Sequence, residues 1–149
     1  MNINHILVAT DLSEEAMSCI PSVAELARSN GAHVTLLHVV ESFEAVPHGS
    51  PLAPPLGPPE DAGTVEKARA QLEERRTSFG PDVDVEVALI GGGDAAEEIT
   101  AYARSHDVDL IAVTTHGRTG FRRIALGSVA EEVVRRSRVP VLVLPLPRE

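Results

Sequence analysis

The hydrophobic residues of this 149-residue chain fall into two kinds of segment that alternate along its length. Short, unbroken apolar runs are typical of strands covered on both faces, whereas apolar residues spaced three and four apart are typical of helices with one buried side. Apolar segments predict strands at residues 6–9, 34–40, 110–113 and 139–144, and the period-two alternation of residues 83–89 predicts a further, edge-proximal strand. Helices are expected between them, at residues 14–29, 64–78, 94–105 and from 128 onward.

The strict alternation of strand and helix predicts the fold class. With right-handed crossovers it gives an α/β fold: a single-domain, doubly wound, five-stranded parallel sheet with helices on both faces, spanning residues 1–149. Aromatic residues make up only 3% of the chain and tryptophan is absent, so the core must consist of Val, Ile, Leu and Ala. Ligands of such sheets bind beyond the carboxyl ends of the strands, where the strand order reverses. The loops after the first and fourth strands are therefore the expected binding loops.

Prolines mark two features of the chain. Pro21 lies inside the first expected helix and removes one backbone hydrogen bond, so we expect a local kink near Met17 rather than two separate helices. Six of the 11 prolines fall within residues 41–62, the one low-complexity segment. We expect this segment to be a mobile loop, which is either functional or disordered.

Polar residues at the starts of two expected helices predict caps. Asp94, followed three residues later by Glu97, has the pattern of a capping box, and Ser128 with Glu131 repeats it. The three glycines at residues 91–93 predict a turn after the third strand.

The most informative motif is Thr114-Thr115-His116-Gly117-Arg118-Thr119-Gly120, which follows an apolar strand and leads to Gly127-Ser128 at a helix start. Backbone N–H groups can converge on an anion at such a position, so the motif predicts phosphate binding. Residues 114–149 carry 7 basic and 3 acidic side chains, net +4, whereas residues 1–113 carry 6 and 19, net −13. The local positive charge favours a small phosphorylated ligand, the alternative being a solvated arginine-rich face.

Composition excludes several other classes of function. A net charge of −9 disfavours binding to a polyanion, and the scarcity of aromatic residues disfavours base stacking, so we expect no nucleic-acid partner. No apolar run approaches the length of a membrane span, and residues 1–5 do not resemble a signal peptide. The lone Cys19 has no partner for a disulfide. We therefore expect a cytoplasmic protein with no membrane partner.

Four segments together resemble the universal stress protein family, in the same order and at the same spacing: Val8–Ser13, Leu36–Val39, Thr115–Gly120 and Gly127–Ala130. The resemblance covers nearly the whole chain and is carried by specific motifs. It implies a Rossmann-like sheet of the adenine nucleotide alpha hydrolase-like type. For the ATP-binding branch of the family it also implies ATP as the cofactor, with Mg²⁺ held by the phosphates.

That branch carries a glycine, two residues, a second glycine, nine residues, and then glycine with serine or threonine. Gly117, nine further residues and Gly127-Ser128 match the second and third parts of this pattern. Thr114 stands at the position of the first glycine, where its β-branched side chain adds bulk.

The resemblance implies roles for individual residues. Asp11 would accept a hydrogen bond from a ribose hydroxyl, and the Ser128 hydroxyl and nearby N–H groups would donate to the phosphates. No catalytic residue and no protein ligand for a metal ion are implied. The adenine and ribose pocket would be lined by Ala9, Thr10, Asp11 and Val39, and the phosphates would be surrounded by Gly117, Arg118, Gly127, Ser128 and Val129. Thr114, His116 and Gly120 complete the predicted cofactor-binding set.

Several of these residues also have a purely structural interpretation. Asp11 can be a turn residue ahead of a cap at Ser13, and Ser128 can cap the last helix. His38 and His116 accompany no nucleophile in a recognisable motif, so both are interpreted as structural.

These observations support one leading function and two alternatives. We expect an ATP-binding, dimeric stress-response regulator that acts on an unidentified protein partner through its binding state. It is not expected to be an enzyme, although slow ATP hydrolysis is compatible with this function. The first alternative is a nucleotide-free dimeric interaction module in which Thr114 closes the site. The second, an ATP-using transferase or pyrophosphatase-like enzyme, is disfavoured because Thr10–Ser13 replaces the Ser-Gly-Gly-rich loop it requires.

The last expected strand, Val139–Leu144, is apolar and is expected at an edge of the sheet. Proteins must cover or pair such an edge. A two-fold homodimer through this strand is therefore expected, as is common in the family that the chain resembles.

Overall fold

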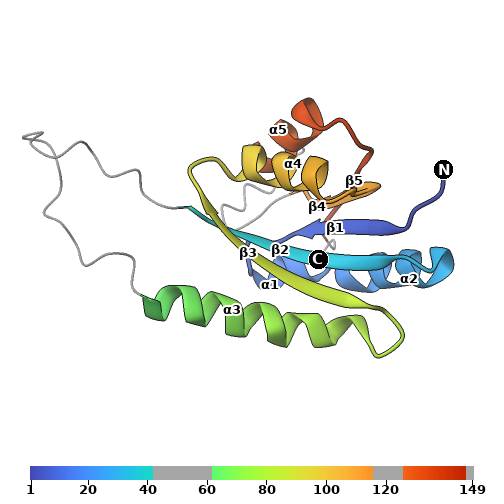
Figure 1. The fold of residues 1–149 in the computed structure, drawn as a ribbon, viewed down its shortest axis with the longest axis horizontal. Coiled ribbons are helices and arrows are strands. Elements are labelled where there is room, and N and C mark those ends of the chain that lie inside the picture. Colours follow the sequence, from blue (N-terminus) through green and yellow to red (C-terminus); the bar gives the residue numbers. More distant parts are fainter. Residues whose placement is uncertain (42–61, 116–125, 147–149) are drawn as a thin grey trace, which may run out of the picture.

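A computed structural model of the chain describes residues 1–41, 62–115 and 126–146. Its centre is a five-stranded sheet in which every pair of neighbouring strands is parallel and the order is β3-β2-β1-β4-β5 (Figure 1). The predicted α/β fold with a five-stranded parallel sheet is confirmed. The strands are β1 (His5–Ala9), β2 (His33–Glu41), β3 (Val85–Gly92), β4 (Leu110–Thr114) and β5 (Val141–Leu144).

Helices cover both faces of this sheet, as Figure 1 shows. One face packs against α2 (Ile20–Asn30) and α3 (Ala62–Arg76), and the other against α4 (Ala95–Ser105) and α5 (Ser128–Arg136). Successive strand residues point to opposite faces, so alternate residues of β1 enter two different cores. Ile6 joins the core beneath α2, and Leu7 joins the core beneath α4. Each such side chain, fully withdrawn from water, contributes about 1.5–3 kcal/mol of transfer free energy.

The first helical region differs from the prediction. Instead of one helix with a kink near Met17, the chain forms a single turn, α1 (Glu14–Met17), and then the separate helix α2. Pro21 explains the break, because its ring would clash with the carbonyl of Met17 in a continuous helix. In the first turn of α2 its missing N–H leaves no hydrogen bond unmade.

One predicted helix cap is confirmed and the other is wrong. The Asp94 carboxylate accepts hydrogen bonds from the N–H groups of Ala96 and Glu97, at 3.0 and 3.3 Å, and so caps α4. At the start of α5 the cap position belongs to Gly127, while Ser128 is the first helical residue. The Ser128 hydroxyl, which was expected to cap this helix, is therefore one residue beyond the cap position.

The segment boundaries near the proline-rich loop also differ. Glu41 is the last residue of β2 and Ala62 begins α3, so neither residue belongs to the loop predicted at 41–62, and residues 42–61 lie outside the described part of the chain. The turn predicted at residues 91–93 begins later than expected, because β3 continues to Gly92, which pairs with Glu41. β3 and β5 are the two edge strands, so the edge position predicted for the last strand is confirmed.

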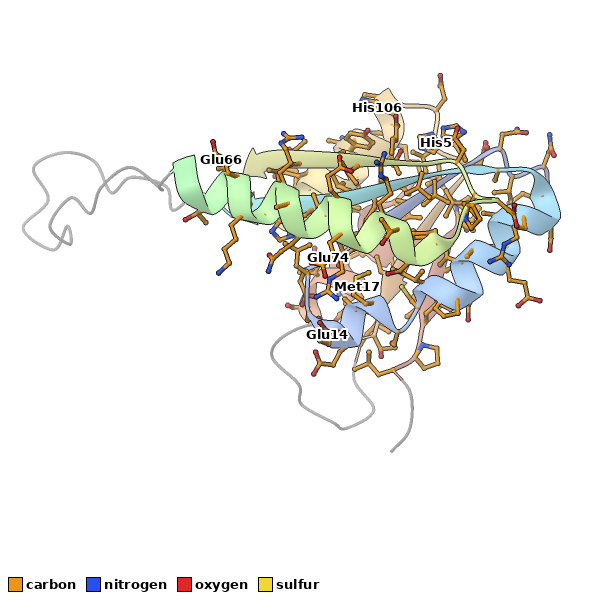
Figure 2. All side chains as sticks on the ribbon, turned by 90° about the horizontal axis from the view of Figure 1, so that it is seen from below. His5, Glu14, Met17, Glu66, Glu74 and His106 are labelled. Atoms are coloured by element: carbon orange, nitrogen blue, oxygen red, sulfur yellow. The ribbon has the colours of Figure 1, made fainter. Side chains whose placement is uncertain are left out.

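His5 is a buried polar residue at the amino end of β1. Its Nδ1 donates to the carbonyl of His106, the C-cap residue that follows α4, at 3.0 Å, and Figure 2 shows the two residues side by side. Its Nε2 lies 2.8 Å from Thr35 Oγ1, and its ring stacks on that of His33 with centroids 4.0 Å apart. Burial, and next the charge of a protonated His33, lower the pKa of His5.

This lowered pKa predicts a loss of stability in acid. The unfolded chain takes up the His5 proton near pH 6.5, whereas the folded protein takes it up only at lower pH, so acid favours the unfolded state. The free energy of unfolding should fall as the pH drops below about 6.5, by at most about 1.4 kcal/mol per pH unit from this one group. Urea unfolding from pH 7.5 to 5 measures it. The variant His5→Asn, which keeps a donor toward His106, should show a shallower decline, and an equal decline would refute the assignment to His5.

Candidate functional site

The candidate site lies where β1 and β4 are neighbours at the middle of the sheet and the strand order reverses. A cavity of about 500 Å³ opens there, beyond the carboxyl ends of the strands. This is the position at which sheets of this type bind ligands. The described residues that line the cavity are Ala9, Thr10, Asp11, Leu37, His38, Val39, Val40, Ala95, Ile99, Val113, Thr114, Thr115, Gly127, Ser128, Val129 and Ala130.

The loop that follows β1 has an unusual backbone. Leu12 has a φ of 67°, in the left-handed region that is costly for a residue with a bulky side chain, by about 1–2 kcal/mol. Two features support this conformation: the side chain of Leu12 is buried, and its N–H donates to Thr10 Oγ1 at 3.0 Å. The N–H of Thr10 in turn donates to the carbonyl of Leu37 on β2, at 2.9 Å, which anchors the loop to the sheet.

Asp11 is a turn residue ahead of the cap at Ser13, and it also lines the cavity. One carboxylate oxygen accepts hydrogen bonds from both the N–H and the hydroxyl of Ser13, at 2.9 and 2.5 Å. The Ser13 oxygen accepts from the N–H of Ala16 at 3.1 Å, and so caps α1. The carboxylate is therefore held in place at the cavity wall by its own turn.

His38 and its neighbours on β2 form a second wall of the cavity. The ring of His38 donates from Nδ1 to the carbonyl of Thr10 at 2.8 Å, a contact that joins β2 to the loop after β1. This contact agrees with the structural interpretation of His38. Because a carbonyl oxygen only accepts, the neutral ring carries its proton on Nδ1 and leaves Nε2 as an acceptor. Val39 and Val40 add an apolar surface beside it.

The third wall is formed by the end of β4 with Thr115, and by Gly127 with the start of α5. Gly127 N–H donates to the carbonyl of Thr115 at 2.6 Å, and Thr115 N–H donates to the carbonyl of Leu144 on β5 at 3.0 Å. These bonds place the first turn of α5, with Ser128 and Val129, at the cavity. N–H groups in the first turn of a helix have no partner within the helix and carry a partial positive charge.

The structure brings together most of the residues that the sequence predicted. Ala9, Thr10, Asp11, Val39, Thr114, Gly127, Ser128 and Val129 all line the cavity, although their role in binding a cofactor stays a prediction. His116, Gly117, Arg118 and Gly120 lie outside the described residues.

Other wall residues were missed. Four of them, Leu37, His38, Thr115 and Ala130, lie inside the segments that carry the family resemblance, and Val40 and Val113 are the next residues beyond such motifs, so the sequence signal for all six was adjacency to predicted residues. Ala95 and Ile99 carry no such signal, because α4 reaches the cavity only through its packing against the sheet and α5.

The chemistry of the described walls varies around the cavity. Val39 and Ile99 offer apolar contacts, Asp11 offers a carboxylate, and the start of α5 offers N–H donors. A molecule with a flat apolar part, hydroxyl groups and an anionic end matches such a set. Within the described ranges, no group of three or more His, Cys, Asp or Glu side chains is placed to hold a metal ion, and no helix there is long and apolar enough to cross a membrane.

Comparison with known proteins agrees with this architecture. Residues 2–145 match the model of the universal stress protein family. The chain is 32% identical over 148 residues to the universal stress protein MJ0531 of Methanocaldococcus jannaschii, an alignment that covers 97% of this chain and 83% of that relative.

Two solved structures are also similar. That of MJ0577, from the same organism, superposes with a TM-score of 0.78 at 26% identity and covers 100% of both chains. A universal stress protein from Archaeoglobus fulgidus in complex with dAMP superposes with a TM-score of 0.69 at 23% identity, covering 96% of this chain and 98% of that one. The chain belongs to the universal stress protein family.

Proposed function

We propose that this protein binds an adenine nucleotide, ATP with Mg²⁺, in the cavity and acts as a dimeric stress-response regulator through its binding state. The observation that carries the proposal is the convergence of Asp11 and the start of α5 on one cavity of about 500 Å³. The A. fulgidus relative in complex with dAMP supports adenine nucleotides as the ligand class.

The walls suggest how the nucleotide would lie. The adenine would contact the apolar side of the cavity at Val39, and a ribose hydroxyl would donate to the carboxylate of Asp11. The phosphates would accept hydrogen bonds from the first turn of α5, where Ser128 supplies both an N–H and a hydroxyl. Mg²⁺ would be bound through the phosphate oxygens, whose charge it would partly neutralise.

The proposed role depends on binding rather than turnover. Neither His38 nor His116 accompanies a nucleophile in a recognisable motif, so a bound nucleotide would stay chemically intact and its occupancy could act as the signal. Slow ATP hydrolysis is compatible with this role. We place the protein in the cytoplasm, because its single cysteine implies no disulfide and hence no need for an oxidising compartment.

One observation favours a second function. Thr114, which replaces the first glycine of the ATP-binding pattern, lines the cavity at the end of β4. If its side chain closes the site, the protein would be a nucleotide-free, dimeric interaction module of the same family.

The nucleotide proposal predicts that Mg-ATP binds with micromolar affinity. Any bound small molecule should be released by denaturation and identified by mass spectrometry, and the emptied protein titrated by calorimetry. Asp11→Asn should weaken binding about tenfold or more, because it removes a charged acceptor for the ribose hydroxyl. Glu15→Gln, a charge-neutralising change on α1, just after the loop that carries Asp11 and outside the cavity wall, should bind like the unchanged protein. Recovery of no ligand together with no binding heat would refute the proposal.

The variant Thr114→Gly separates the two functions. If the unchanged protein already binds ATP, removing the side chain should change its affinity by less than about threefold, which is less than one hydrogen bond is worth. A large gain in affinity would instead indicate that Thr114 closes the site and would support the interaction module. Calorimetry on both proteins under the same conditions measures the difference.

The dimer is predicted to form through β5, the apolar edge strand. Val143→Lys places a charge on this edge and should convert a two-fold dimer to a monomer at micromolar concentration, as measured by analytical ultracentrifugation. Val134→Lys, at a position on α5 that is 47% exposed, is the control and should leave the mass unchanged. A monomeric mass for the unchanged protein would contradict the prediction.

A further inference from the structure

One side chain of α3 reaches the loop that carries Asp11. A terminal nitrogen of Arg75 donates to the Leu12 carbonyl at 3.4 Å and to the Glu14 carboxylate at 2.7 Å. Figure 2 shows the place where α3 passes α1, with Glu74, Met17 and Glu14 labelled. The side chain of Arg75 is only 20% exposed, whereas that of Glu14 is 82% exposed. Arg75 is therefore held between the two elements rather than lying on the surface.

The carbonyl that Arg75 contacts belongs to the most strained residue of the loop. Leu12 is in the left-handed conformation, and its N–H is bound by Thr10. With the contact from Arg75, both the N–H and the carbonyl of Leu12 have hydrogen-bond partners. A strained backbone persists only where the surrounding contacts satisfy its polar groups in this way. Asp11 immediately precedes Leu12, and its carboxylate is held by the next residue, Ser13. The direction of the Asp11 side chain thus depends on the backbone at Leu12.

The cost of this arrangement points to a role beyond simple packing. The Nε atom of Arg75 is buried without a hydrogen-bond partner among the described residues. A buried donor left unpaired costs about 1–3 kcal/mol. The exposed pair with Glu14 offsets little of that cost, since ion pairs open to water contribute between zero and about 1 kcal/mol. For an interaction that only ties α3 to the fold, an apolar side chain would be less costly.

We propose that Arg75 is a positioning residue: through the Leu12 carbonyl it holds Asp11 in the orientation that receives a ribose hydroxyl, and so couples α3 to the cavity. The inference rests on the proposed nucleotide binding and deepens it. Loss of Arg75 should therefore weaken the binding only of nucleotides that carry a ribose hydroxyl, because only these can donate a hydrogen bond to Asp11. Arg75 itself is not among the residues that line the cavity.

The test compares ATP with 2′,3′-dideoxy-ATP, which lacks both hydroxyls that Asp11 could accept. Arg75→Met keeps the length and apolar stem of the side chain but removes its donors. It should weaken ATP binding about tenfold while changing dideoxy-ATP binding by less than about twofold. Arg75→Lys, which restores one donor and the charge, should recover part of the difference. Arg76→Met is the matched control, because the neighbouring Arg76 pairs with Glu73 on the surface and forms no ion pair with the loop after β1 among the described residues.

Equal weakening for both nucleotides, or no weakening for either, would overturn the proposal, because a general disturbance of the fold does not distinguish the two ligands. A second measurement needs no nucleotide: amide hydrogen exchange at Leu12 and Ser13. Exchange at both should be faster in Arg75→Met and unchanged in Arg76→Met.

This second measurement keeps the two proposals distinguishable. Failure of the unchanged protein to bind either nucleotide would defeat the proposed function, and the exchange rates alone would then decide whether Arg75 positions the loop. Exchange unchanged by Arg75→Met would overturn that role whatever the binding results are.

Discussion

The burial of the central strands on both faces is the constraint on which the rest of the structure depends. Ile6, Leu7 and Val8 are at most 1% exposed, so the middle of β1 has no side that water can reach. Helices must then lie on both faces, and the parallel crossovers that place them there bring every strand to an end at the same edge of the sheet. The cavity between β1 and β4 follows from this arrangement, because the chain leaves these two strands toward opposite faces.

The loop after β1 shows how that rigid frame supports a costly local conformation. Leu12 has an unfavourable backbone geometry, but its side chain enters the core beneath α2 and so adds apolar burial that offsets the strain. Thr10 and Asp11 then satisfy the N–H groups of Leu12 and Ser13 with their own side chains. A flexible loop would lose this geometry, whereas here the sheet and the core determine it together.

The sequence predicted those features that depend on local physical chemistry. Apolar segments located four of the strands and a period-two alternation located β3, and Asp94 was recognised as a cap because its carboxylate acts on residues two and three positions away. Features set by tertiary contacts were not predictable in this way. The N–H of Gly127 donates to the carbonyl of Thr115, and this contact places Gly127 rather than Ser128 at the cap position of α5. Strand β3 extends to Gly92 because Gly92 pairs with Glu41 on the neighbouring strand β2. Ile99 reaches the cavity through helix packing, which no short motif records.

Electrostatics give the proposed binding mode a direction along the cavity. The Asp11 carboxylate and the phosphates of a nucleotide repel each other, so the two must lie at opposite ends of the site. The segment before residue 114 is strongly acidic and the segment after it is basic, with net charges of −13 and +4. The positive end of the α5 dipole also lies in the basic segment, so the helix dipole and the side-chain charges both favour phosphates near α5. We therefore infer that the sugar faces β1, the phosphates face α5, and an anion at the β1 side would bind poorly.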